Sequence, residues 1–360
     1  MPREILLFAL PMGVAFVMSI LVAPLVIRVL KRGKVGQTIQ EDGPESHFSK
    51  AGTPTMGGII IIVGILAGVA ATLIAGRGDA FFFSGFTIGA PSGLGRLIAV
   101  LALMLAYGLL GAVDDYLTIH PIGDVRGIAS KPKAIIQLLL AAGFVFWLRQ
   151  SGCQPILSVG GQHFYLGEAY WILALFFIAG MANFVNITDG LDGLVSGLVA
   201  VAFAGLLSSL MYGYLMMVDV PGAPYSSAVI FAPVVFATIG ACVAFLWFNT
   251  NPARVFMGDT GSLALGALLP AVAIMLHREV LMIVLGLVFI LDGFSTIIQW
   301  AVFKFTRITT GTGKRVFLKS PVHHHFELMG WPEQTVVVRF WICGVIAAML
   351  GYVGMALGWW

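Results

Sequence analysis

Five short polar segments interrupt an otherwise apolar chain and carry most of its residues that could bind phosphate, metal or sugar. They read DGPESHFSKAGTPTMGG at 42–58, VDDY at 113–116, NITDGLDG at 186–193, FNTNPARVFMGDTGS at 248–262 and SPVHHHFE at 320–327. Carboxylates, amides, imidazoles and glycines stand there where lipid-facing positions would be apolar, which suggests one convergent site.

Asp114 and Asp115 are adjacent carboxylates at the end of a predicted apolar span. A helix C-terminus disfavours negative charge because of the helix dipole, so two acids there are costly without a compensating cation. Two interpretations follow. The pair is either solvated at a membrane surface, or it faces Mg²⁺ or a reacting phosphate.

Three further aspartates stand beside glycines near the predicted starts of spans. Asp189 and Asp192 would share one face of the first turn of the sixth span. Asp189 and Asp259 could equally cap helix N-termini, where Asp is favoured. Gly258 and Gly261 could instead seat a phosphate on free N–H groups at the start of the eighth span. Neutral hydrogen bonds suited to ribose or base edges are available from Asn183, Asn186, Asn249 and Asn251.

His323, His324 and His325 form a run of three imidazoles. Consecutive residues seldom direct three side chains to one metal, and no Cys or HExxH pattern lies nearby, so zinc is the less favoured interpretation. Hydrogen bonds to phosphate or sugar are expected instead, with His324 as a donor to a bound nucleotide sugar.

Asp292 lies inside the ninth predicted apolar span, where an ionisable group is expensive and is by default functional or paired. Gln299 follows about two helical turns later and so lies on the same face. For both residues, a structural hydrogen bond between helices is an equal alternative.

The elements that position these motifs must be membrane-spanning helices. The 360 residues are 59% hydrophobic and 10% charged, whereas soluble domains carry roughly a quarter charged residues. Apolar runs of about 20 residues, the length that crosses a bilayer, predict ten spans. They lie at roughly 5–28, 56–76, 95–117, 134–150, 169–186, 191–217, 226–247, 261–277, 280–305 and 336–358. The predicted fold is therefore all-α and polytopic.

The 20 Lys and Arg residues are distributed unevenly among the predicted loops. Fifteen lie in the odd-numbered loops and adjoining helix ends, and five lie on the opposite face. The positive-inside rule then places the first face in the cytoplasm and both termini outside, in the periplasm. All five polar segments fall on the cytoplasmic face, which predicts one active site in a single transmembrane catalytic domain over 1–360. A net charge of +3 without a basic aromatic tract argues against nucleic acid.

With these residues in view, the sequence resembles the polyprenyl-phosphate N-acetylhexosamine-1-phosphate transferase superfamily. The motifs that carry the resemblance span nearly the whole chain and read DGPESHFSKAGTPTMGG, GAVDDY, NITDGLDGL, WFNTNPARVFMGDTGSLALG and PVHHHFELMGWPE. The DGPxSH segment and the unbroken HHHFE run resemble the branch of phospho-N-acetylmuramoyl-pentapeptide transferases.

The resemblance implies a bacterial inner-membrane enzyme that uses Mg²⁺, UDP-MurNAc-pentapeptide and undecaprenyl phosphate. It assigns acceptor-phosphate chemistry to Asp114 and Asp115, and Mg²⁺ to Asp259. Nucleotide contacts fall on Asn186, Asp189, Asp192, Asn249, Phe256, Gln299 and His324. Residues expected to border the site or contact phosphate are Lys50, Thr55, Lys133, His323 and His325. Oligomeric state stays open, with a homodimer as one form.

One position departs from the family pattern, and three other functions remain as alternatives. Thr118 stands where relatives usually carry Lys, so Arg126, Lys131 or Lys133 must supply the missing charge. The first alternative is a GlcNAc-1-phosphate transferase of the same superfamily. The second is a ten-helix transporter, which should hold its polar groups near the bilayer midplane. The third is an intramembrane metalloprotease, which would need His ligands at helical spacing that this chain lacks.

Overall fold

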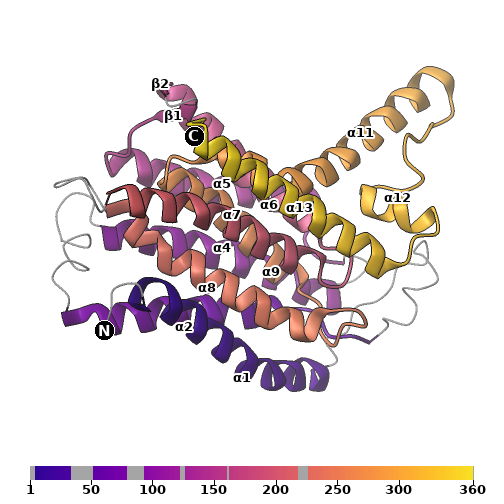
Figure 1. The fold of residues 1–360 in the computed structure, drawn as a ribbon. Coiled ribbons are helices and arrows are strands. Elements are labelled where there is room, and N and C mark those ends of the chain that lie inside the picture. Colours follow the sequence, from indigo (N-terminus) through magenta and orange to yellow (C-terminus); the bar gives the residue numbers. More distant parts are fainter. Residues whose placement is uncertain are drawn as a thin grey trace.

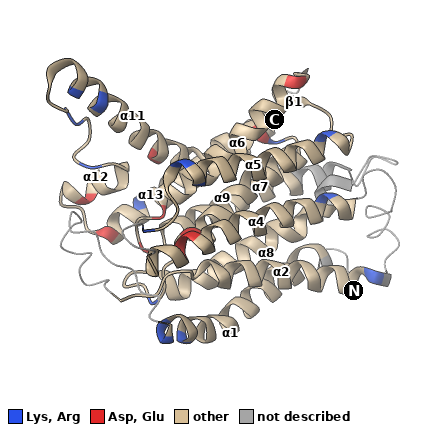
Figure 2. Ribbon diagram, turned by 180° about the vertical axis from the view of Figure 1, so that it is seen from behind, with Lys and Arg blue, Asp and Glu red and all other residues tan. Residues whose placement is uncertain are grey.

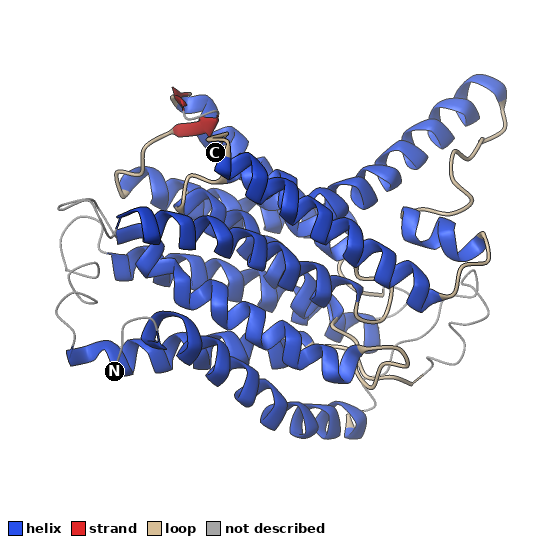
Figure 3. Ribbon diagram, in the orientation of Figure 1, coloured by secondary structure: helices blue, strands red, loops and turns tan. Residues whose placement is uncertain are grey.

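The structure is a bundle of long helices with one small β-hairpin (Figures 1 and 3). This computed structural model describes residues 5–33, 52–78, 93–121, 126–159, 162–217 and 226–359. The first half of the chain contains η1 (Ile5–Ala9), α1 (Leu10–Arg32), α2 (Gly58–Ala75), η3 (Gly76–Gly78), α4 (Gly93–Ile119), α5 (Ser130–Gln150), β1 (Ile156–Val159) and β2 (Gln162–Tyr165). The second half contains α6 (Glu168–Thr188), α7 (Leu194–Met217), α8 (Ser226–Asn249), α9 (Gly258–Met275), α10 (Glu279–Leu285), α11 (Leu287–Thr310), α12 (Val322–Leu328) and α13 (Glu333–Ala356).

Ten helices within the described residues are long and apolar enough to cross a membrane, and each overlaps one of the ten predicted spans. The all-α polytopic fold is thereby confirmed. The first and last described segments lie at the same end of the bundle, as an even number of spans requires (Figures 1 and 2). Figure 2 also shows Lys and Arg at the last turns of α1 and on α11, at the end that carries α12. Which end faces the cytoplasm stays a prediction.

The ninth predicted span, 280–305, was wrong in its boundary. The helix breaks at Gly286, which separates the short α10 from α11, and the candidate span is Leu287–Thr310. Glycine is a poor helix former, and the carbonyl oxygens near the end of α10 accept hydrogen bonds from the Gly286 N–H. Beyond this break α11 tilts away from the bundle toward α12 (Figure 1). The antiparallel hairpin of β1 and β2 was not predicted.

Helix α9 forms the centre of the bundle and packs against α4, α6 and α2. Its residues from Thr260 to Met275 are all buried, as expected for a helix that is apolar all round. Small residues let neighbouring backbones come close, which is how membrane helices pack. At Gly111 of α4, an added Cβ would overlap the backbone of Asp259. This close approach carries the last turns of α4, with its two aspartates, to the first turn of α9.

Candidate active site

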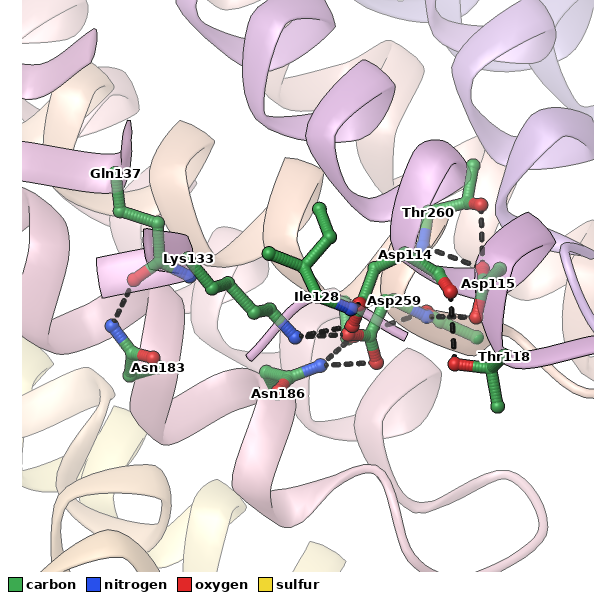
Figure 4. A network of polar contacts seen from close by, with 12 residues as sticks. Asp114, Asp115, Thr118, Ile128, Lys133, Gln137, Asn183, Asn186, Asp259 and Thr260 are labelled. Carbon is green, nitrogen blue, oxygen red and sulfur yellow. Dashed lines mark hydrogen bonds and ion pairs between the residues drawn. The ribbon is translucent and has the colours of Figure 1, made fainter. Parts of the chain in front are cut away.

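The centre of the site is an ammonium group held between two carboxylates (Figure 4). Lys133 Nζ, from the first turn of α5, lies 2.8 Å from Asp114 Oδ2 of α4. The same ammonium forms an ion pair with Asp259 Oδ2 at the start of α9. Asp114 also accepts a hydrogen bond from the backbone N–H of Ile128 at 2.5 Å. Three helices that are distant in sequence therefore meet at one cationic group.

Asn186, near the end of α6, adds a fourth helix to this cluster. Its Nδ2 donates to Asp259 Oδ1 at 2.8 Å and to Ser262 Oγ at 2.9 Å. Both oxygens of Asp259 are thus engaged, one by an amide and one by an ammonium. The side chain of Asp259 is 26% exposed and that of Asp114 is 12% exposed, so Asp259 is the more accessible carboxylate.

Asp115 points in a different direction and satisfies the N-terminus of α9. Its Oδ1 accepts the Asp259 N–H at 3.1 Å, and its Oδ2 accepts the Thr260 N–H at 3.0 Å and the Thr260 hydroxyl at 2.6 Å. The first N–H groups of a helix lack partners within the helix, so a buried carboxylate there is stabilising. Asp115, only 8% exposed, therefore caps α9 from outside the helix.

The capping interpretation of Asp259 was wrong. Met257 precedes α9 and makes no side-chain capping hydrogen bond, while Asp259 lies inside the first turn and faces Lys133. Asp115, which belongs to α4, caps α9 instead. The carboxylate of Asp259 is thereby left for other chemistry, even though aspartate at this position looks like a cap in the sequence.

Asp189 and Asp192 lie in the loop between α6 and α7, so the predicted placement on a first helical turn was wrong. Burial raises the pKa of Asp189 well above its usual range, and the carboxylates of Asp259, Asp115 and Asp192 raise it further. Asp192 is 4% exposed and accepts hydrogen bonds from the Ala253 N–H and the Asn251 amide.

Asn249 links the loop between α6 and α7 to the loop before α9. Its Oδ1 accepts the Gly193 N–H at 3.0 Å, and its Nδ2 donates to the Val255 carbonyl at 2.9 Å. The loop from 250 to 257 is also tied to the segment before α2, because Phe256 N–H donates to the Pro54 carbonyl at 2.8 Å. These bonds hold the predicted nucleotide residues on neighbouring loops.

Thr55, from the polar segment at 42–58, lies near the start of α9. Thr55 is 6% exposed, and a Cβ on Gly258 would meet both its hydroxyl and the carboxylate of Asp115. Gly258 has a φ of +71°, a conformation that favours glycine. Lys50 lies outside the described residues.

The three imidazoles point to three different partners. His323 Nδ1 lies 2.7 Å from Asp292 Oδ2, and His324 Nδ1 lies 2.7 Å from Glu327 Oε2. His325 Nδ1 accepts the N–H of a residue in the preceding loop. Among the residues the structure describes, no group of three His, Cys, Asp or Glu side chains could hold a metal ion. The three side chains of the run therefore diverge.

The surroundings of His324 bear on its expected donor role. Burial lowers the pKa of His324, and the hydrogen bond that the ring donates to Glu327 opposes that shift only in part. A neutral ring that donates its Nδ1 proton to Glu327 carries an acceptor, not a donor, at Nε2.

Asp292 and Gln299 both make structural hydrogen bonds, which is the alternative that the sequence left open. Asp292 binds His323, and Gln299 Oε1 accepts the N–H groups of Val316 and Phe317 at 2.9 and 3.0 Å. Both side chains leave the same face of α11 and hold the segment that follows it.

Of the three cations predicted to supply the charge missing at Thr118, Lys133 is the one that lies in the cluster. The Thr118 hydroxyl donates to the Asp114 carbonyl at 2.8 Å and offers no charge. Arg126 and Lys131 are exposed, and Lys133 is the cation that reaches both Asp114 and Asp259.

Comparisons with known proteins agree with this geometry. A model described as glycosyl transferase family 4 matches residues 97–277, and a phospho-N-acetylmuramoyl-pentapeptide-transferase signature matches residues 50–62. The chain is 42% identical over 353 residues to the phospho-N-acetylmuramoyl-pentapeptide-transferase of Geobacillus thermodenitrificans, covering 98% of each protein. It is 43% identical over 347 residues to that of Bacillus cytotoxicus, covering 95% of this chain and 96% of the relative. The chain belongs to the phospho-N-acetylmuramoyl-pentapeptide transferase family.

The matched regions contain the cluster described above. The family model runs from α4 to α9 and so includes Asp114, Lys133, Asn186 and Asp259. The signature covers the segment with Thr55 that is hydrogen-bonded to the loop before α9. The segments matched by the family model and the signature thus meet at this cluster.

Two acidic residues of the site were missed in the sequence. Glu327 holds His324, and Glu333 accepts the Asp192 N–H at 2.8 Å and the Asn251 amide at 3.0 Å. The spacing of His324 and Glu327 is three residues, which places them on one helical face and could have revealed that pair. Glu333 carries no such local signal, because its partners are distant in sequence.

Proposed function

We propose that this chain transfers phospho-MurNAc-pentapeptide from UDP-MurNAc-pentapeptide to undecaprenyl phosphate, releasing UMP and forming lipid I. This is the first membrane step of peptidoglycan synthesis. The observation that carries the proposal is the ammonium of Lys133 paired with both Asp114 and Asp259, in a chain that belongs to this transferase family.

The reaction joins two anions, so the site must neutralise charge and align the reactants. A phosphate oxygen of the lipid attacks the sugar-linked phosphorus, the pyrophosphate bond breaks, and UMP leaves with the bridging oxygen. A phosphate monoester has a second pKa of about 6, so the lipid phosphate is largely dianionic at neutral pH and needs no strong base. Asp114 then serves to orient Lys133, and the ammonium of Lys133 contacts the phosphates.

The donor set suits Mg²⁺, which takes oxygen ligands and uses one or two carboxylates together with substrate phosphates. Asp259 and Asp114 already hold one cation, the ammonium of Lys133, between them. The same two carboxylates would hold Mg²⁺, with Asn186 fixing the orientation of Asp259. When bound, the ion supplies charge neutralisation on the pyrophosphate.

The other predicted site residues divide into two roles under this proposal. Asp115 orients the start of α9, so that Asp259 meets the phosphates. The nucleotide and sugar lie over the loops that carry Asn186, Asp189, Asn249, Phe256 and His324. Asp192 and Gln299, whose side chains hold loops in place, act from behind that surface.

We propose that the cluster faces the cytoplasm of a bacterial inner membrane, in line with the distribution of Lys and Arg. The soluble nucleotide would then reach it from the side where such donors are made. The lipid phosphate would reach the same end from the bilayer. A homodimer remains a proposal for the assembly.

Purified protein in detergent should release UMP when given UDP-MurNAc-pentapeptide, undecaprenyl phosphate and Mg²⁺. A parallel reaction with UDP-GlcNAc should release far less. Turnover of UDP-GlcNAc alone would assign the chain to the GlcNAc-1-phosphate branch, and release of UMP from neither donor would contradict the proposed activity.

A further inference from the structure

The junction between α11 and α12 is built around a carboxylate and an imidazole that are both completely buried. Asp292 Oδ2 lies 2.7 Å from His323 Nδ1, and Asp292 Oδ1 accepts the His323 backbone N–H at 3.2 Å. Ser295, one turn further along α11, accepts the Val322 N–H at 2.9 Å and donates to the Asp292 carbonyl at 2.6 Å. Both oxygens of Asp292 therefore fix one residue of α12.

This contact determines which way the His323 ring faces. A carboxylate at Nδ1 accepts the proton there, so the ring is held with Nε2 on the opposite side. Nε2 is buried and has no hydrogen-bond partner among the described residues. An added Cβ on Gly190 would collide with it, so the edge of the ring lies directly against the loop between α6 and α7.

That loop and the neighbouring ring both belong to the nucleotide side of the site. Gly190 follows Asp189 and lies four residues after Asn186, which holds Asp259. On its other side the His323 ring packs against His324, with ring centroids 4.2 Å apart. A Cβ on Gly190 would also lie 3.2 Å from His324 Nε2, so the loop packs against both rings, and the His323 ring contacts two groups that the proposed function assigns to the nucleotide sugar.

We propose that Asp292 and His323 form a positioning pair for the nucleotide half of the active site. His323 does not touch the substrate, in contrast to the phosphate or sugar contact expected from its place in the HHH run. Asp292 fixes the ring, and the ring sets the spacing between the Asp189 loop and His324. The inference rests on the proposed function for its kinetic readout, since the affected quantity is the affinity for the nucleotide donor.

The kinetic test uses two variants that disturb the pair from opposite sides. Asp292→Asn replaces the acceptor at Nδ1, and Gly190→Ala pushes the loop against Nε2. Each should raise KM for UDP-MurNAc-pentapeptide by about tenfold, the equivalent of one charge-assisted hydrogen bond. KM for undecaprenyl phosphate should stay within about twofold. Both changes displace the His323 ring, so their effects should not be additive in the double variant, although the Cβ of Gly190→Ala also lies 3.2 Å from His324 Nε2.

Ser295→Ala is the matched control, because it loosens the same end of α12 and leaves the pair intact. It should lower the melting temperature and leave the donor KM within about twofold of wild type. Equal increases in donor KM for Ser295→Ala and Asp292→Asn would overturn the proposal and leave only a helix anchor. An increase in KM for both UDP-MurNAc-pentapeptide and undecaprenyl phosphate would also overturn the proposal.

A measurement on the wild type without turnover separates this inference from the proposed activity. In protein labelled with ¹⁵N-histidine, the His323 signals, assigned by their loss in His323→Gln, should show a protonated Nδ1 hydrogen-bonded to carboxylate. A proton on Nε2 with a bare Nδ1 would overturn the positioning pair even if UMP release is normal. Failure of UMP release with the expected histidine signals would instead contradict only the activity.

Discussion

Replacing Asp115 with asparagine tests the division of labour between the two adjacent aspartates. Asp115 accepts three hydrogen bonds from Asp259 and Thr260 at the start of α9, and none of these can be shared with solvent at 8% exposure. An asparagine keeps one acceptor oxygen and turns an NH₂ group toward the other donors. At least one buried N–H of α9 is then left without a partner.

The expected loss of stability follows from that unpaired donor. Leaving a buried donor unsatisfied costs about 1–3 kcal/mol, and a bond to a charged acceptor is worth about 1.5–3 kcal/mol. We expect Asp115→Asn to destabilise the protein by about 2 kcal/mol, which lowers the melting temperature by a few degrees. Turnover should fall by up to about a hundredfold, because the backbone of Asp259 moves with the first turn of α9.

Thermal melting in detergent, followed by tryptophan fluorescence, and UMP release should be measured on the same preparations. Thr260→Val is the matched control, since it removes only the 2.6 Å hydroxyl bond and should cost about 1 kcal/mol with little effect on turnover. An Asp115→Asn protein with wild-type melting and no turnover would refute the reasoning. Asp115 would then act on the reactants and not on α9.

Two further predictions concern residues away from the reacting groups. Burial raises the pKa of Glu279 to about 7, although Tyr170 donates to it at 2.5 Å. A native pKa above the unfolded value of 4.5 means that the stability of the wild type falls as pH rises from about 4.5 through 7. The free energy of unfolding of Glu279→Gln should therefore exceed that of wild type by up to about 3 kcal/mol at pH 8 and equal it at pH 4. Parallel profiles of stability against pH for the two proteins would contradict this. Gly111→Ala should lower stability by about 1–3 kcal/mol and reduce turnover, because its Cβ meets the backbone of Asp259. The control Gly143→Ala, with open space around its Cβ, should change neither. Equal effects of the two substitutions would contradict the close contact between α4 and α9.

The positions of the spans could be predicted because apolar length is a local property of the sequence. Gly286 was the exception, since a single glycine in an apolar run does not reveal whether the helix continues. The loop between α6 and α7 was misplaced for a related reason. Asp189 beside Gly190 resembles a helix start, but the preceding helix extends to Thr188.

The meeting of Asp114 and Asp259 could be predicted from polar segments at one end of the spans, and the family resemblance added Lys133 as a residue bordering the site. The hydrogen-bond partners of these residues could not be predicted. That Asp115 would cap α9, and so free Asp259, depends on the approach of α4 to α9 at Gly111. Such contacts between distant segments leave no periodic signal in the chain.

The alternative of a transporter is disfavoured by the same arrangement. The cluster of Asp114, Lys133, Asn186 and Asp259 lies at the ends of α4 and α6 and the beginnings of α5 and α9. A transporter site lies near the bilayer midplane at broken helices. Asp292, an acid inside the predicted ninth span, is paired with His323.

UMP release by Asp259→Asn at saturating Mg²⁺ is the most direct test of the reaction centre. Asparagine keeps the shape of the side chain and its bond from Asn186, and α9 remains capped by Asp115, so the melting temperature should stay close to wild type. Turnover should fall by at least about a hundredfold, because the carboxylate that pairs with Lys133 and would hold Mg²⁺ has lost its charge. Near-wild-type turnover at limiting Mg²⁺ would contradict the assignment of Asp259 to the centre of the reaction.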